Sequence, residues 1–201
     1  MEGCDLAVVN LADGAVTTIA FAPDLEGELI FACNNSFAWT QDSSAIYFTP
    51  VRIGAPMGHP TLYRADLATG QSEPVTPAQA INAPLTLYSH PYMLADGSLL
   101  VLIAQVEQLP LSFSEETEAL SYTIARLDPA TGNLEPGTST QPLVARLGHA
   151  VWAPDGAGLV AYRYEEQGEV SLIFVPTQTG EPQLIQLEEG PLLGIAWGLN
   201  E

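Results

Sequence analysis

The feature that most constrains the fold is a short phrase that returns along the chain: a large apolar residue, two spacers and a turn-forming residue. The turn residue is Asp or Asn, whose side chain can accept a hydrogen bond from the backbone two residues on. The large residues are Trp39, Met93, Trp152 and Trp197, and the turn residues are Asp42, Asp96, Asp155 and Asn200. β-rich runs follow the first three copies at 45–48, 99–103 and 159–162, so each copy predicts a strand, a tight turn and a second strand.

A second phrase alternates with the first and consists of an apolar strand, a turn that ends in glycine, and another strand. Glycine suits that place because it takes a positive φ at no steric cost. The copies end at Gly14, Gly70, Gly132 and Gly180. Two hairpins make four strands per repeat, and a four-stranded repeat of about 40–50 residues is typical of a β-propeller blade.

These phrases predict an all-β fold, an antiparallel β-propeller of four-stranded blades within a single domain, 1–201. Complete blades are expected at 36–76, 86–140 and 147–187. A terminal hairpin at 5–20 and the first strand of a further blade at 192–201 would be the split parts of another blade. Trp39, Met93, Trp152 and Trp197 are expected to be largely buried on equivalent inner strands.

The turn Trp152-Ala153-Pro154-Asp155-Gly156 and the hairpin Asp66-Leu67-Ala68-Thr69-Gly70 resemble the TolB-like, WD-like β-propeller repeat. The resemblance covers most of the chain. Met93 in place of Trp, and Gln41 where Pro is usual, depart from the pattern. Such propellers serve mostly as interaction platforms, so the resemblance implies a non-enzymatic scaffold for a protein or peptide partner, with a cell-envelope or secreted location favoured.

Two alternatives from another functional class stay open. The chain could be the propeller portion of a prolyl-oligopeptidase-like hydrolase that lacks its catalytic domain, or a lyase or glycosidase with a site at the channel mouth. A Gly-x-Ser-x-Gly region elsewhere in the parent protein would favour the first, and histidines and carboxylates around a bound ion would favour the second. The sequence shows no arrangement of catalytic residues, and it predicts no cofactor and no metal.

Composition narrows the possible partners. The chain has 201 residues and a formal net charge of −19, from 24 Asp and Glu against five Arg and no Lys. Such a charge disfavours nucleic acid and anionic membrane surfaces as partners. No apolar run is long enough to span a bilayer, and no signal-peptide pattern is visible. Cys4 and Cys33 could form a disulfide or stay as two thiols, and the compartment is left undecided.

Few residues are candidates for a site. His90 and His149 each lie six residues before the Asp of their turn, so they are expected at equivalent places on strands that line the central channel. A polar or metal-binding lining is one interpretation, and a repeat-position residue bonded to neighbouring backbone is the favoured one. Phe113, in an acidic insert at 107–118, is a candidate partner contact, or it folds back over its own blade.

The two ends predict an assembly. A hairpin at 5–20 without inner strands and a strand at 192–197 without outer ones leave sheet edges that need partners. One chain could join its own ends in a four-bladed ring, the chain could be part of a larger propeller, or two chains could exchange ends. The exchange, which predicts a homodimer, is preferred because wider rings are more common.

Overall fold

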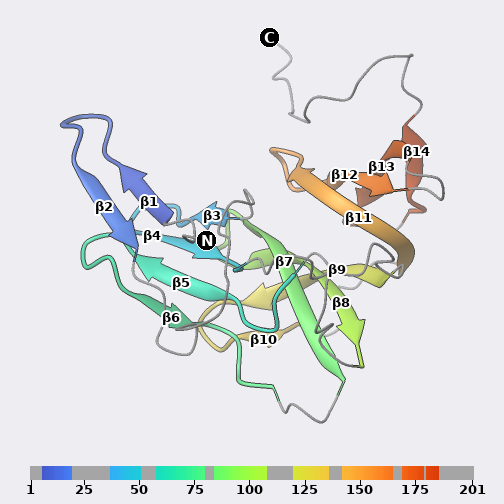
Figure 1. The fold of residues 1–201 in the computed structure, drawn as a ribbon, viewed down its shortest axis with the longest axis horizontal. Coiled ribbons are helices and arrows are strands. Elements are labelled where there is room, and N and C mark those ends of the chain that lie inside the picture. The colour runs from blue at the N-terminus through green and yellow to red at the C-terminus, as the bar shows by residue number, and fades with distance from the viewer. Residues whose placement is uncertain are drawn as a thin grey trace.

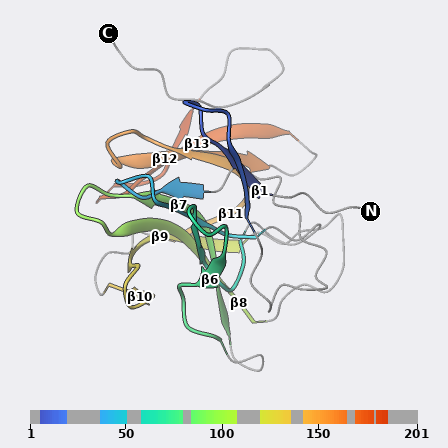
Figure 2. The same ribbon diagram turned by 90° about the vertical axis from the view of Figure 1, so that its left-hand side faces the viewer.

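The computed structural model describes residues 6–19, 37–50, 58–79, 84–107, 120–135, 142–164, 169–178 and 180–185 (Figures 1 and 2). These residues form β-strands joined by turns, and the pairs are antiparallel. No helix in the described part of the chain has the length and apolar character needed to cross a bilayer. The strands are β1 Leu6–Val9, β2 Val16–Ile19, β3 Phe37–Trp39, β4 Ala45–Phe48, β5 Tyr63–Asp66, β6 Ser72–Pro74, β7 Leu85–Met93, β8 Leu99–Val106, β9 Leu120–Asp128, β10 Asn133–Leu134, β11 Leu143–Trp152, β12 Gly158–Tyr164, β13 Val170–Pro176 and β14 Gln183–Ile185.

Each of the ranges 36–76, 86–140 and 147–187 contains most or all of one antiparallel meander of four consecutive strands. The first meander is β3–β6, the second β7–β10 and the third β11–β14. In Figure 1 they follow one another from the β1–β2 hairpin at one side of the molecule to β14 at the other. The arrangement is all-β and consistent with a β-propeller-like fold.

The third meander differs from its prediction at its first strand, which begins at Leu143. Residues Leu143–Ala145 of β11 pair with Leu120–Tyr122 of β9, so the second and third meanders form one continuous sheet. The cause is the shortness of β10, which pairs only with Leu127 and Asp128 at the far end of β9. The rest of that edge offers backbone donors and acceptors, and β11 takes part of them.

The turns after β3, β7 and β11 confirm the role predicted for their aspartates. The backbone amide two residues on donates to the carboxylate in each turn, at 3.0 Å from Ser44 to Asp42, 3.1 Å from Ser98 to Asp96 and 2.9 Å from Ala157 to Asp155. Gly97 and Gly156 have φ of 86° and 69°, as the turn requires. These bonds end each first strand at the same place in its repeat.

The glycines that close the second type of turn bring neighbouring units into contact. Gly70 has φ of 70°, and a Cβ atom there would lie 2.7 Å from the carbonyl oxygen of Thr18, in β2. Gly132 has φ of 72°, and a Cβ there would meet the carbonyl oxygen of Val75, just after β6. Each turn therefore packs its backbone against the outer strand of the preceding unit, and the β1–β2 hairpin occupies the place of such an outer pair.

The core lies between neighbouring units, as face-to-face sheets require. Ile19 of the hairpin packs with Ile46, Phe48 and Tyr63 of the first meander. A second cluster joins the first meander to the second, and a third cluster joins the second to the third. The members of the second cluster include Ala38, Tyr47, Leu62, Tyr88, Leu99, Val101 and Leu127.

Candidate functional site

A cavity of about 430 Å³ lies where the ends of β3, β7 and β11 meet. Its wall consists of residues 37–39, 90–93 and 150–152, one segment from the first strand of each meander. We call it the aromatic cavity, because Phe37, Trp39, Tyr92 and Trp152 contribute four rings to its lining. Its volume is in the range of small-ligand and side-chain pockets.

The cavity explains why the predicted burial of the large turn residues is wrong for Trp39 and only partial for Met93 and Trp152. Trp39 is 43% exposed, and Met93 and Trp152 are half-buried. Met93 and Trp152 still pack against core clusters with part of their side chains, whereas Trp39 ends its strand beside the open space. Trp197 lies outside the described residues, as do Phe113, Cys4 and Cys33.

Two hydrogen bonds fasten the end of β7 to the end of β11. The indole Nε1 of Trp152 donates to the carbonyl oxygen of His90 at 2.6 Å, and the Tyr92 hydroxyl donates to the carbonyl oxygen of Pro154 at 2.5 Å. The rings of Tyr92 and Trp152 also lie against one another, with centroids 5.8 Å apart and planes at 31°. These contacts hold the β7 and β11 segments of the cavity wall together.

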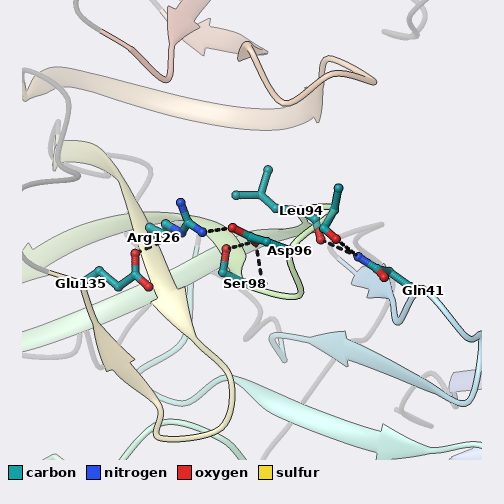
Figure 3. Close-up of polar contacts among 7 residues, drawn as sticks. Gln41, Leu94, Asp96, Ser98, Arg126 and Glu135 are labelled. Carbon is teal, nitrogen blue, oxygen red and sulfur yellow. Dashed lines mark hydrogen bonds and ion pairs between the residues drawn. The ribbon is translucent and has the colours of Figure 1, made fainter.

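The turn after β7 is held from two sides (Figure 3). The side-chain amide of Gln41 donates to the carbonyl oxygens of Leu94 at 3.0 Å and Ala95 at 2.6 Å. On the other side Arg126 contacts the carboxylates of Asp96 and Glu135, the latter at 3.0 Å. Gln41, which departs from the usual Pro of the repeat, thus links the first turn to the second.

His90 and His149 occupy corresponding irregularities in their strands. The pairing register shifts between Ser89 and Tyr92 in β7, and between Leu147 and Ala150 in β11. The two imidazole rings lie 6.5 Å apart between centroids, and the ring of His149 lies 6.1 Å from that of Tyr162. Of the two histidines His90 is in the cavity lining, and it is only 4% exposed.

The lining is uncharged at neutral pH. Burial, with a smaller contribution from the nearby His149, lowers the pKa of His90 to about 3. Burial also raises the pKa of Tyr92, and the charge of Asp155 raises it further. His90 therefore stays neutral above that low pKa, and it is a poor proton donor or base for chemistry at neutral pH.

The described residues of the cavity lining include no carboxylate, and the nearest ones in sequence lie in the turns that follow its wall segments. Asp42 and Asp155 each follow a cavity tryptophan by three residues, in the turn that ends its strand. The backbone amide of Ser44, helped by the hydroxyls of Thr40 and Ser44, lowers the pKa of the exposed Asp42 to about 2. Asp96, the third turn carboxylate, is bonded to Arg126.

Within the described ranges, His, Cys, Asp and Glu side chains do not gather in any group of three or more that could hold a metal ion. His59, the remaining histidine, has a structural position. Its Nδ1 accepts a hydrogen bond from the Thr61 amide at 3.0 Å, and its backbone bridges to Tyr88 of β7. It joins the loop before β5 to the second meander.

The sequence-based prediction, which selected His90, His149 and Phe113, missed the aromatic lining. The sequence did contain a usable signal, because the residues that line the cavity directly precede the turns and several of them are aromatic. Tyr92 could have been recognised by its place directly before Met93, at the end of a predicted strand.

No protein-family model matches this chain, and no curated protein matches it. Among solved structures it is similar to an oligogalacturonate lyase in complex with manganese, with 16% sequence identity and a TM-score of 0.48. The match covers 89% of this chain and 57% of that one, so the chain spans little more than half the length of the protein it matches.

Proposed function

We propose that this chain forms part of a β-propeller that acts as a non-enzymatic scaffold and binds a protein or peptide partner at the aromatic cavity. Three consecutive four-stranded meanders support the propeller, as do turns at corresponding positions. Gly70 and Gly132, each against the preceding unit, support it further, because neighbouring blades pack face to face in this way.

The observation that carries the binding role is the composition of the cavity wall. Partner contacts that contribute much binding energy are rich in Trp and Tyr, and they lie in pockets that exclude water. Here Trp39 and Phe37 are large, apolar and 43% and 42% exposed, beside the fixed pair of Tyr92 and Trp152. Exposed rings next to a rigid aromatic wall are suited to accept a side chain from outside.

The same wall is poorly suited to acid–base catalysis. Its titratable members are His90 and Tyr92, whose pKa values are shifted away from neutrality in opposite directions. A general acid or base works best with a pKa near the working pH. Binding is therefore the role that the charges of this wall support.

A selection of random peptides displayed on phage tests the proposal directly. Peptides enriched on the wild-type protein should lose affinity for Trp39→Ala by about tenfold or more, as expected when an aromatic anchor is removed. Because Trp39 is 43% exposed and belongs to none of the described core clusters, this change should leave the core intact. Leu184→Ala, at a 57% exposed position on β14, is the matched control and should leave affinity unchanged.

Peptides that bind both variants equally well, or the failure of any peptide to be enriched, would contradict the assignment of the cavity. The purified protein should also show no turnover of peptide or glycoside substrates. Turnover that persists through repurification and depends on protein concentration would replace the scaffold with an enzyme.

A further inference from the structure

The aromatic cavity differs from an ordinary apolar pocket in its electrostatic surroundings. Its lining is neutral, yet the whole chain carries a formal charge of −19 with only five cationic side chains. A field of that size attracts cations and repels anions over the distance of the Debye length. Any ligand that reaches the cavity is therefore selected first by its charge.

The charges closest to the cavity act in the same direction. Asp42 and Asp155 lie in the turns that directly follow Trp39 and Trp152, and the charge of Asp155 is felt by Tyr92 in the wall. The nearby Arg126 contacts two carboxylates, Asp96 and Glu135, so its charge is more than offset. The turns that follow the Trp39 and Trp152 segments of the wall are therefore negatively charged.

The rings favour the same kind of ligand. Aromatic faces carry the negative part of the ring quadrupole, and they attract ammonium and guanidinium groups. A bare metal ion would find few oxygen ligands in this lining, whereas an organic cation can use the ring faces for contact and is favoured by the negative charge of the adjoining turns.

We propose that the aromatic cavity binds the cationic side chain of a basic peptide, with Trp39 as the ring that contacts it and with Asp42 and Asp155 as the carboxylates that favour its charge. This inference rests on the proposed function, because it names the chemistry of the partner bound at the same cavity. The carboxylates are positioning and charge-selecting groups, while the aromatic rings provide the contact surface.

The test compares two capped peptides that differ in one charge, Gly-Ser-Arg-Ser-Gly and the same peptide with citrulline in place of arginine. Citrulline has nearly the shape of arginine but no charge. Binding is followed by NMR through the indole N–H signals of the tryptophans, which detect weak binding and localise it. The arginine peptide should bind about tenfold more tightly than the citrulline peptide, the equivalent of about 1.4 kcal/mol.

Three variants assign the effect to the cavity. Trp39→Leu keeps an apolar side chain but removes the ring face, and it should abolish the preference for arginine. Asp42→Asn and Asp155→Asn keep an oxygen that can accept the turn hydrogen bond while removing the charge, and each should reduce the preference. Val144→Ala, at a 66% exposed position near the other end of β11, is the control and should leave it unchanged.

Raising the ionic strength from about 0.1 M to about 1 M shortens the Debye length from about 10 Å to about 3 Å. It should therefore weaken binding of the arginine peptide more than binding of the citrulline peptide. Equal binding of the two peptides at the cavity would overturn the charge preference and leave the proposed binding role standing. Binding by neither peptide, or a preference for arginine that persists in Trp39→Leu, would overturn the inference, and the phage selection would still decide the proposed function by itself.

Discussion

His90 combines a left-handed backbone with an almost completely buried ring. Its φ is 47°, a region that non-glycine residues seldom adopt, and its pKa is lowered from 6.5 to about 3. The carbonyl oxygen of the same residue accepts the indole hydrogen bond of Trp152, and its ring faces that of His149. One residue thus supports the cavity wall through its backbone while its side chain resists protonation.

The buried ring makes stability depend on pH. Because the folded pKa of His90 lies below the unfolded value of 6.5, the unfolded chain gains a proton that the folded chain does not, and stability falls as the pH drops below 6.5. The slope for one such group approaches about 1.4 kcal/mol per pH unit. Urea unfolding measured between about pH 7 and about pH 4 should show this fall, which is steepest below the unfolded pKa.

The matched variant is His90→Asn, since asparagine tolerates the left-handed backbone and does not titrate. Its stability should vary less with pH over the same interval. Four turn aspartates with lowered pKa values affect stability in a lower pH range, and they are Asp42, Asp66, Asp96 and Asp128. The stability that they contribute is present above pH 3.8 and is lost only as the pH falls below that value. If the free energy of unfolding varied with pH equally in wild type and variant, the buried imidazole would not determine the pH dependence of stability in this range.

At the scale of the elements, the strands at 45–48, 99–103 and 159–162 were predictable because a tight turn precedes each β-rich run. The aspartates of those turns were equally readable, since their hydrogen bonds are local. The pairing of β11 with β9 was not, because it depends on how little of β9 the two-residue β10 covers.

The candidate site was predictable only in part. Equal spacing from a turn places His90 and His149 at corresponding positions, and the structure brings their rings 6.5 Å apart. The exposure of Trp39 could not be read from its neighbours in sequence, because it depends on which unit packs beside the end of β3. The register shifts in β7 and β11 likewise arise from the pairing of strands, and no characteristic residue composition marks them in the sequence.

Two glycines with the same backbone conformation should respond differently to substitution. Gly14 and Gly132 have φ of 74° and 72°, but a Cβ at Gly14 meets nothing within 4 Å, while one at Gly132 meets the backbone of Val75. Gly14→Ala should therefore cost about 1–2 kcal/mol, the strain of the left-handed backbone. Gly132→Ala should cost more than that by about 1 kcal/mol or more, because two units must separate as well.

Thermal or urea unfolding of the two variants, measured side by side, checks this difference. The comparison isolates the contact between units from the conformational preference, because the latter is shared. Equal losses of stability would mean that the turn at Gly132 does not pack against the first meander as described.

At the scale of the whole molecule, the β1–β2 hairpin is the least supported element among the described strands. One face packs on the first meander through Ile19, Leu6 and Val8, while Val9 and Val16 on the other face are 52% and 62% exposed. In the described part of the chain β1 pairs only with β2. Its other edge therefore presents backbone groups that favour a further strand.

We expect that strand to come from a second copy of the chain, through residues 192–197, which lie outside the described ranges. Light scattering after size exclusion should then give a mass near twice 21.4 kDa. Deleting residues 1–20 should abolish the dimer. Because that deletion also removes Ile19 from the core, Val9→Lys is the gentler variant, since an edge lysine opposes strand pairing. A monomer that persists at micromolar concentration would rule out the exchange.

The shared pairing of β9 and β11 has a mechanical consequence. From β7 to β14 the strands are linked by backbone hydrogen bonds without interruption. A force that pulls the second and third meanders apart must therefore break backbone hydrogen bonds between strands. Between the first and second meanders the described links are side-chain packing, the bonds of Gln41, the bonds between Gln79 and Thr86, and the bridge from His59 to Tyr88. This junction is therefore weaker under tension than the continuous sheet, and the aromatic cavity lies partly along it, between β3 and β7. A ligand bound in the cavity would contact both meanders and so strengthen this junction.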